Sequence, residues 1–210
     1  MALPVIVVGA GGHAKVVLAA LEEAGFEVQG MIDADATRIG RRVLGVPVLG
    51  DDGILAGYTG DTIGLVNGIG STGRADTRIA VFERFHDLGF VFVTIVHPRA
   101  FVAADVEIAE GAQVMAGAII QPGCRIGENA IVNTGARIDH DCIIGAHAHI
   151  APGAVLCGGV TVGRGAHVGA GSTVIQNIEI GPRGLVGAGA VVVAAVGTGS
   201  TVVGVPARKV

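Results

Sequence analysis

Two short motifs contain residue types that could bind a nucleotide or move a proton. The first is glycine-rich: Gly9 and Gly11 follow an apolar segment, Ala14 comes three residues later, and Asp33 ends the next apolar segment. This spacing fits the loose GxGxxG/A pattern, in which small residues let a helix N-terminus approach a diphosphate and an acid reaches a ribose. The same glycines can also serve plain strand–helix packing.

The second motif is DHDC, at residues 139–142. An imidazole beside a carboxylate can accept a proton near neutral pH, and a neighbouring thiol can act as a nucleophile. A histidine on a turn can equally be a solvated surface residue. The six-residue repeat described below puts Cys142 at an inward corner, so we expect its thiol to be buried, which disfavours covalent catalysis.

Residues 1 to about 97 alternate strand-like and helix-like segments. We expect strands at 4–8, 27–32, 62–66 and 90–96, and helices at 13–24 and 75–88, each helix with glycine behind it. This order predicts an α/β domain with a small parallel, Rossmann-like sheet, whose ligand would bind at the carboxyl ends of the strands. A dehydrogenase using NAD is the rival interpretation, but the segment is too short for both mononucleotide halves.

From residue 100 a six-residue period replaces this alternation. Steps of six pass through sixteen branched aliphatic residues: Val102, Ile108, Val114, Ile120, Ile126, Val132, Ile138, Ile144, Ile150, Leu156, Val162, Val168, Val174, Ile180, Val186 and Val192. A small residue usually stands two places before each, and Gly, Asn or Asp usually stands three places after. The pattern predicts a parallel β-helix of hexapeptide repeats, with residues eighteen apart stacked at about 4.8 Å.

Composition excludes several classes of function. The net charge is −4 and no Lys/Arg cluster occurs, which argues against a nucleic-acid partner. Cys124, Cys142 and Cys157 form no CxxC pair, so neither a disulfide framework nor a metal site is expected. Residues 1–8 have no basic segment or cleavage site, and glycines interrupt the uncharged stretch 184–207, so we expect a cytoplasmic protein without membrane insertion.

Longer motifs carry a family resemblance over almost the whole chain. They are VVGAGGHAKVV at 7–17, HPRAFV at 97–102, NTGARIDHDCIIG at 133–145, HIAPGAVLCGGVTVG at 149–163 and GVPARKV at the end. With them the chain resembles the hexapeptide acyltransferases, and more narrowly the family of sialic acid O-acetyltransferases and of the N-acetyltransferases of bacillosamine and perosamine biosynthesis. The hexads alone indicate only the superfamily, whereas GAGGHAK together with DHDC is specific.

The resemblance implies an architecture and an assembly. It implies a nucleotide-sugar-binding α/β domain at 1–97 and a left-handed β-helix acyltransferase domain at 98–210. The left hand rests on the resemblance, because spacing does not determine it. Members of the family are homotrimers of parallel prisms, with acetyl-CoA, the co-substrate, in a groove between neighbouring helices. No metal is expected.

The resemblance also implies roles for residues of the repeat region. His140 would be the general base and Asp141 the carboxylate that orients it, because an ammonium must lose a proton before it attacks a thioester. The backbone N–H of Gly158 would stabilise the charge that develops on the thioester oxygen, although Gly158 and Gly159 can equally be plain turn glycines. Asn133 would contact the sugar substrate and His149 the acetyl-CoA, with direct transfer in a ternary complex.

In the N-terminal domain, the resemblance implies that two glycine-containing loops and two acidic residues hold the nucleotide-sugar. The expected substrate-binding residues are Gly9, Gly11, Gly12, His13, Asp33, Asp35, Gly70 and Ser71. Backbone N–H groups and His13 would face the diphosphate, and the two aspartates would lie near the ribose or base.

Two further histidines receive no functional role. His167 follows His149 by eighteen residues, so the two are expected to stack on one outer face. His147 falls at a turn and is expected to be solvated. Residues 97–99 are expected to act as a hinge between the domains.

The function that the sequence favours is therefore an acetyl-CoA-dependent N-acetyltransferase acting on the 4-amino group of a nucleotide-linked dideoxysugar, of the GDP-perosamine or UDP-sugar type, in glycan biosynthesis. O-acetylation of a sialic acid or similar sugar is the alternative within the same fold. A non-catalytic hexapeptide scaffold or binding module is the alternative from another class.

Overall fold

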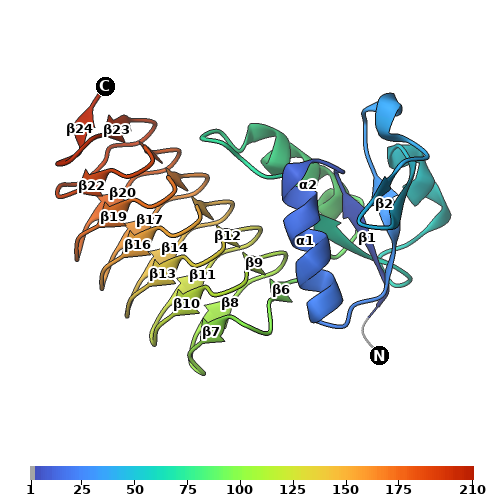
Figure 1. The fold of residues 1–210 in the computed structure, drawn as a ribbon, viewed down its shortest axis with the longest axis horizontal. Coiled ribbons are helices and arrows are strands. Elements are labelled where there is room, and N and C mark those ends of the chain that lie inside the picture. Colours follow the sequence, from blue (N-terminus) through green and yellow to red (C-terminus); the bar gives the residue numbers. More distant parts are fainter. Residues whose placement is uncertain (1–2) are drawn as a thin grey trace.

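The computed structural model describes residues 3–210; Met1 and Ala2, the start of the segment searched for a targeting signal, lie outside the described residues. Figure 1 shows an α/β domain followed by a stack of short strands that coils away from it. Neither α-helix in the described part of the chain, each of twelve residues, is long enough to cross a membrane.

The N-terminal domain is built on a five-stranded sheet in the order β3-β4-β2-β1-β5. The strands are β1 Val5–Val8, β2 Val28–Ile32, β3 Arg42–Val43, β4 Val46–Gly50 and β5 Gly64–Asn67. All neighbours are parallel except β3, which pairs antiparallel with β4. The predicted strands at 4–8, 27–32 and 62–66 are confirmed, each shifted by no more than two residues. Segment 36–57, for which no element was expected, forms β3 and β4 and two 3-10 helices, η1 Ala36–Arg38 and η2 Asp52–Gly57.

One helix covers each face of this sheet. Helix α1, Gly12–Glu23, packs against Val5 and Val7 on one face of β1, while Ile6 and Val8 on the other face share a cluster with residues of α2, Asp76–Asp87. Both predicted helices are therefore confirmed, each end within one residue. Since β1 is buried on both faces, all four of its residues are apolar, as expected for a central parallel strand.

The predicted strand at 90–96 is wrong as a single element. Phe92 makes an isolated parallel bridge to Leu65 of β5, whereas β6, Ile95–Val96, pairs with Gln113–Val114 in the repeat region. Thr94 lies between them and donates from Oγ1 to the carbonyl of Ala109, 3.0 Å away. The apolar run thus serves two sheets, and the chain passes from one domain to the other within it.

The repeat region forms a three-sided prism of two-residue strands. One sheet contains β7 Phe101–Val102, β10 Ile119–Ile120, β13 Arg137–Ile138, β16 Val155–Leu156, β19 Thr173–Val174 and β22 Val191–Val192. A second contains β8 Glu107–Ile108, β11 Arg125–Ile126, β14 Ile143–Ile144, β17 Thr161–Val162 and β20 Glu179–Ile180. The third contains β6, β9 Gln113–Val114, β12 Ile131–Val132, β15 His149–Ile150, β18 His167–Val168, β21 Leu185–Val186, β23 Thr201–Val203 and β24 Arg208–Lys209. We call these faces one, two and three.

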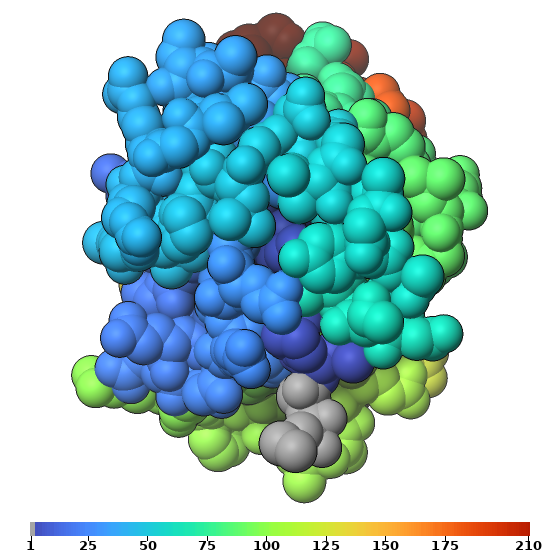
Figure 2. Space-filling model, turned by 90° about the vertical axis from the view of Figure 1, so that its right-hand side faces the viewer, coloured from blue at the N-terminus to red at the C-terminus, as the bar shows by residue number. Residues whose placement is uncertain are grey.

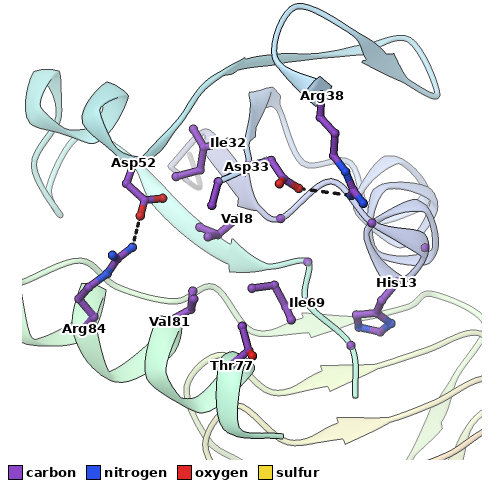
Figure 3. Close-up of a pocket in the computed structure, with 16 residues that line it drawn as sticks. Val8, His13, Ile32, Asp33, Arg38, Asp52, Ile69, Thr77, Val81 and Arg84 are labelled. Atoms are coloured by element: carbon purple, nitrogen blue, oxygen red, sulfur yellow. Dashed lines mark hydrogen bonds and ion pairs between the residues drawn. The ribbon is translucent and has the colours of Figure 1, made fainter. Parts of the chain in front are cut away.

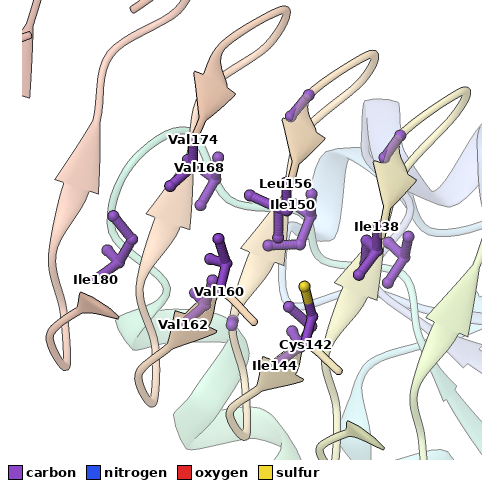
Figure 4. Packing of buried hydrophobic residues seen from close by; sticks show 14 of the residues in the cluster. Ile138, Cys142, Ile144, Ile150, Leu156, Val160, Val162, Val168, Val174 and Ile180 are labelled. Atoms are coloured by element: carbon purple, nitrogen blue, oxygen red, sulfur yellow. The ribbon is translucent and has the colours of Figure 1, made fainter. Parts of the chain in front are cut away.

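The register of the prism is the predicted one. Strands eighteen residues apart pair in parallel, for example Ile120 with Ile138 and Ile138 with Leu156. The repeated aliphatic residues point inward and fill the axis, as Figure 4 shows for the middle coils. Full burial of each such side chain stabilises the fold by about 1.5–3 kcal/mol. The Cys142 thiol is buried among them, and burial raises its pKa to about 12, which makes it a poor nucleophile.

The turns require one residue per hexad in the left-handed region. Positive φ recurs every six residues from Gly111 to Gly189, and five of these fourteen positions carry side chains: Asn129, Asp141, His147, Asn177 and Arg183. Asn and Asp tolerate this conformation because their short polar side chains bond locally. Glycine spares that cost at the other positions.

Helix α2 lies along the corner between faces two and three. The buried Arg78 donates to the carbonyl oxygens of Asn129 and His147, and Phe82 packs edge-on against the His147 ring at 5.4 Å between centroids. His147, predicted to be solvated, is therefore fully buried, and its burial lowers its pKa to about 4. Figure 2 looks onto the N-terminal domain, which in this view stands in front of most of the coils.

Candidate active site

The DHDC motif presents an exposed imidazole–carboxylate pair at the corner between faces one and two. The His140 side chain is 61% exposed, and its Nδ1 lies 2.8 Å from Asp141 Oδ2. The hydrogen bond to Asp141, with the nearby charge of Asp139, raises the pKa of His140. When Nδ1–H donates to the carboxylate, Nε2 is left with a free lone pair that can accept a proton.

Two glycines make room for this pair, one in the coil before it and one in the coil after it. A Cβ atom on Gly158 would lie 2.5 Å from both Cε1 and Nε2 of His140, so the ring rests directly over that residue. A Cβ on Gly123 would collide in the same way with the Asp141 carboxylate. Within the described residues, no backbone carbonyl accepts the N–H of Gly158, although the residue is buried beneath the imidazole.

A shallow groove adjoins this corner on face one. It has a volume of about 290 Å³ and is lined by Ile119, Gln121, Arg137, Ile138, Asp139, Val155, Leu156 and Cys157. Asp139 and Cys157 directly precede His140 and Gly158 in the sequence. The imidazole therefore stands at the edge of a largely apolar groove in which a second molecule can lie.

A larger cavity lies in the N-terminal domain, at the carboxyl ends of β1, β2 and β5 (Figure 3). Its volume is about 450 Å³. The structure brings six of the predicted substrate-binding residues into its wall: Gly9, Gly11, Gly12, His13, Asp33 and Gly70. The position is the one expected for a ligand in an open parallel sheet.

The start of α1 gives this cavity an anion-binding end. No side chain caps the helix, no acidic residue lies in its first turn, and Gly11 and Gly12 leave the backbone uncovered. The first N–H groups of a helix lack internal partners and carry partial positive charge, so they favour a phosphate. Arg38 and Arg84 add two guanidinium groups to the wall, beside Asp33 and Asp52 respectively.

The two predicted acidic residues have different positions. Asp33 stabilises the glycine-rich turn, because its Oδ2 accepts a hydrogen bond from the N–H of Ala10 at 2.7 Å. The same oxygen lies 3.4 Å from Nη1 of Arg38. Asp35 is outside the residues that line the cavity. Its carboxylate caps η1 by accepting from the N–H and hydroxyl of Thr37.

Ser71 also lies away from this cavity, at the junction of the two domains. Its Oγ is 2.8 Å from His149 Nδ1, while His149 Nε2 is 3.0 Å from the amide of Asn133. Burial lowers the pKa of His149 to about 3, so its ring is neutral. The expected stacking with His167 is confirmed as an edge-to-face contact of 5.0 Å, and Ser71, His149 and His167 line a groove of about 410 Å³.

Sequence reasoning missed several residues of these sites. Arg38, Thr77 and Arg84 line the cavity, and Gln113 of the prism bonds to His13, with 2.8 Å between Oε1 and Nε2. A polar side chain at an outward position of a strand is the only signal for Gln113, because nothing in the repeat indicates which face the N-terminal domain covers.

Within one chain the imidazole and the cavity lie on different sides of the prism. Gln113 and His149, which contact the N-terminal domain, belong to face three. His140 stands at the corner where faces one and two meet, the corner opposite face three. The cavity of one chain is therefore turned away from its own imidazole. No cluster of three or more metal-ligating side chains occurs among residues 3–210.

Comparisons with known families agree with both halves of the structure. The family described as the PglD N-terminal domain matches residues 4–85. The family described as the bacterial transferase hexapeptide, six repeats, matches 105–140, 123–158 and 141–176. A comparison with curated proteins gives no match.

Solved structures match the chain over its whole length. A histidine-to-asparagine mutant of perosamine N-acetyltransferase from Caulobacter crescentus, in complex with CoA and GDP-perosamine, is 41% identical, with a TM-score of 0.90 over 99% of this chain and 96% of that one. The acetyltransferase domain of PglB from Neisseria gonorrhoeae, in complex with acetyl coenzyme A, is 34% identical, with a TM-score of 0.91 over 99% and 98%. WeeI from Acinetobacter baumannii is 26% identical, with a TM-score of 0.89 over both full chains.

Proposed function

The chain belongs to the family of hexapeptide-repeat sugar acetyltransferases that carry a PglD N-terminal domain, and on that premise we propose that it transfers acetyl from acetyl-CoA to the 4-amino group of a nucleotide-linked dideoxysugar. The observation that carries the proposal is the exposed His140–Asp141 pair seated over Gly158. We assign sugar binding to residues 1–97 and acetyl transfer to 98–210. Since acetyl-CoA and nucleotide-sugars are cytoplasmic metabolites, the reaction belongs in the cytoplasm.

The chemistry of the N-terminal cavity supports a nucleotide-sugar as acceptor. Gly9, Gly11 and Gly12 place the backbone against the bound diphosphate, at the positive end of α1. Arg38 and Arg84 add positive charge along the same wall. GDP-perosamine is the preferred candidate, because the perosamine N-acetyltransferase that is 41% identical to this chain has the same fold and binds GDP-perosamine.

In the reaction His140 Nε2 takes a proton from the sugar ammonium. The freed amine attacks the thioester carbonyl and a C–N bond forms. As the C–S bond breaks, the imidazolium of His140 gives its proton to the departing sulfur, so that CoA leaves as a thiol, and the nitrogen loses its second proton to water to leave the amide. Asp141 holds the imidazole through Nδ1 and stabilises the imidazolium. The N–H of Gly158 donates to the oxygen of the tetrahedral intermediate, a contribution typically worth about 10²–10³ in rate.

The cavity and the imidazole require two chains to meet. Because His140 stands opposite the face that carries its own N-terminal domain, the sugar reaches it from a neighbouring chain. A homotrimer of parallel prisms satisfies this at three equivalent sites. Acetyl-CoA would lie between two prisms, in the groove beside His140, where Asn133 and His149 come from the other prism.

Release of CoA with a panel of acceptors tests the proposal. We expect turnover with GDP-perosamine or another nucleotide-linked 4-amino sugar, an N-acetylated product by mass spectrometry, and a loss of about 10²–10⁴ in turnover for His140→Ala with an unchanged melting temperature. Turnover only with hydroxyl acceptors would instead indicate an O-acetyltransferase. Tight ligand binding without CoA release would indicate a binding module, and an unchanged rate in His140→Ala would refute the mechanism.

A further inference from the structure

A residue of the prism reaches into the N-terminal cavity and fixes one of its side chains. Gln113 of β9 is 1% exposed, and its amide lies between the two domains. Its Nε2 donates to the carbonyl oxygen of Asn67 at 2.6 Å, and its Oε1 is 2.8 Å from His13 Nε2. These are a backbone group of β5 and the side chain that follows the glycine-rich turn.

The contact with Asn67 determines the tautomer of His13. A carbonyl oxygen only accepts, so the group of Gln113 that faces Asn67 must be the NH₂, and the group that faces His13 must be the amide oxygen. That oxygen also only accepts, and His13 therefore carries its proton on Nε2. The other ring nitrogen, Nδ1, is left with a lone pair.

The lone pair of Nδ1 is open to a ligand. His13 lines the cavity. Three side-chain nitrogen atoms in residues 3–210 are shielded from solvent and have no hydrogen-bond partner: Arg78 Nε, His147 Nε2 and His167 Nδ1. His13 Nδ1 is not one of these shielded atoms. Burial lowers the pKa of His13, the hydrogen bond to Gln113 partly opposes that shift, and the charge of Arg78 adds a smaller lowering. His149, 6.4 Å away between ring centroids, is another titratable group nearby, and the cavity wall also carries the charged side chains of Asp33, Arg38, Asp52 and Arg84.

We propose that Gln113 is a specificity-determining residue: it holds His13 as the neutral Nε2–H tautomer, so that Nδ1 accepts a hydrogen bond from a hydroxyl or amino group of the bound nucleotide-sugar. Phosphate oxygens carry no hydrogen and cannot fill this role, so they pair with the backbone N–H groups at the start of α1 instead. The inference rests on the proposed function. It adds the requirement that the substrate present a hydrogen-bond donor, a hydroxyl or amino group, to His13 Nδ1.

Gln113→Met tests the anchoring of His13. Its side chain has similar length but neither donates to Asn67 nor accepts from His13. We expect the KM for GDP-perosamine to rise about 5- to 50-fold, because a substrate donor loses its fixed acceptor, while kcat and the KM for acetyl-CoA change by less than about threefold. Gln29→Met, at an exposed position of β2, is the matched control. A KM for GDP-perosamine equal to that of the control would overturn the proposal.

Gln113→Glu tests the tautomer, with binding measured by calorimetry so that turnover plays no part. A carboxylate beside His13 Nε2 raises the pKa of His13, so Nδ1 becomes a donor as the pH falls from 8 to 6. Over that range we expect the Kd of GDP-perosamine to rise and the Kd of free GDP to fall in the variant, with neither trend in the wild type. A purely structural role would give losses that do not depend on pH, and that result would overturn the proposal. Failure of the proposed function would appear instead as a wild type without acetyl transfer.

Discussion

Gly158→Ala is the smallest change that disturbs the proposed base without removing it. The added methyl group would lie 2.5 Å from Cε1 and Nε2 of His140, whereas ordinary contacts begin near 3.4 Å. The imidazole must therefore move by about 1 Å, and a misplacement of that size can cost about 10² in rate. The backbone N–H of residue 158 stays in place, so the loss comes from the base alone.

The fold should tolerate this methyl group. Gly158 does not have positive φ, and Thr134, Pro152 and Ala170 occupy the equivalent turn position at another corner of the prism. Because His140 is exposed, its ring can move into solvent. Although Gly158 itself is buried, we expect a melting temperature within a few degrees of the wild type, because the clash is with an exposed ring that can move aside.

A double-mutant cycle separates this mechanism from others. We expect kcat to fall about 10²-fold in Gly158→Ala, with little further loss when the substitution is added to His140→Ala, because the displaced ring is already absent. CoA release at saturating acetyl-CoA and GDP-perosamine measures both effects. Equal losses in the two backgrounds, or a wild-type rate for Gly158→Ala, would refute the placement of His140 over Gly158 during catalysis.

Two further changes test the surroundings of the site. Asp141→Asn keeps a residue that tolerates positive φ but removes the carboxylate that raises the pKa of His140. The acidic limb of the pH–rate profile should therefore move to lower pH, and the plateau rate should fall by up to about 10². An acidic limb at the wild-type pH would contradict the pairing of His140 with Asp141. Arg78→Met leaves the carbonyls of Asn129 and His147 without their charged donor and should lower the free energy of unfolding by about 1.5–3 kcal/mol or more, relative to Arg74→Met on the exposed loop. An equal stability of these two variants would show that Arg78 does not join the domains.

The prism could be predicted from the sequence because its constraints are local. Each hexad needs an aliphatic residue that points to the axis, such as Ile138, and a turn residue with positive φ, such as Gly135. Stacking every eighteen residues makes any error in register costly, so the pattern recurs without a gap. The exposure of His140 and the burial of Cys142 follow directly from that register.

The contacts between the domains could not be predicted because they depend on which face the N-terminal domain covers. His147 occupies an ordinary turn position, yet α2 buries it. Ser71 lies on the expected loop but bonds to His149 rather than lining the cavity. Asp35 follows the correct strand, but its carboxylate caps the next short helix. Each of these outcomes is decided by packing between segments far apart in the sequence.

Complementation between two inactive variants tests most directly whether each site is shared by two chains. His140→Ala removes the base, and Gly12→Glu places a carboxylate at the start of α1, where a Cβ has open space and where a bound diphosphate would be repelled. In mixed trimers isolated through two different tags, one site in three combines an intact His140 with an intact neighbouring cavity, so we predict about one third of the wild-type acetyl transfer. Mixed trimers as inactive as either parent would contradict a site built by His140 of one chain and the cavity of the next.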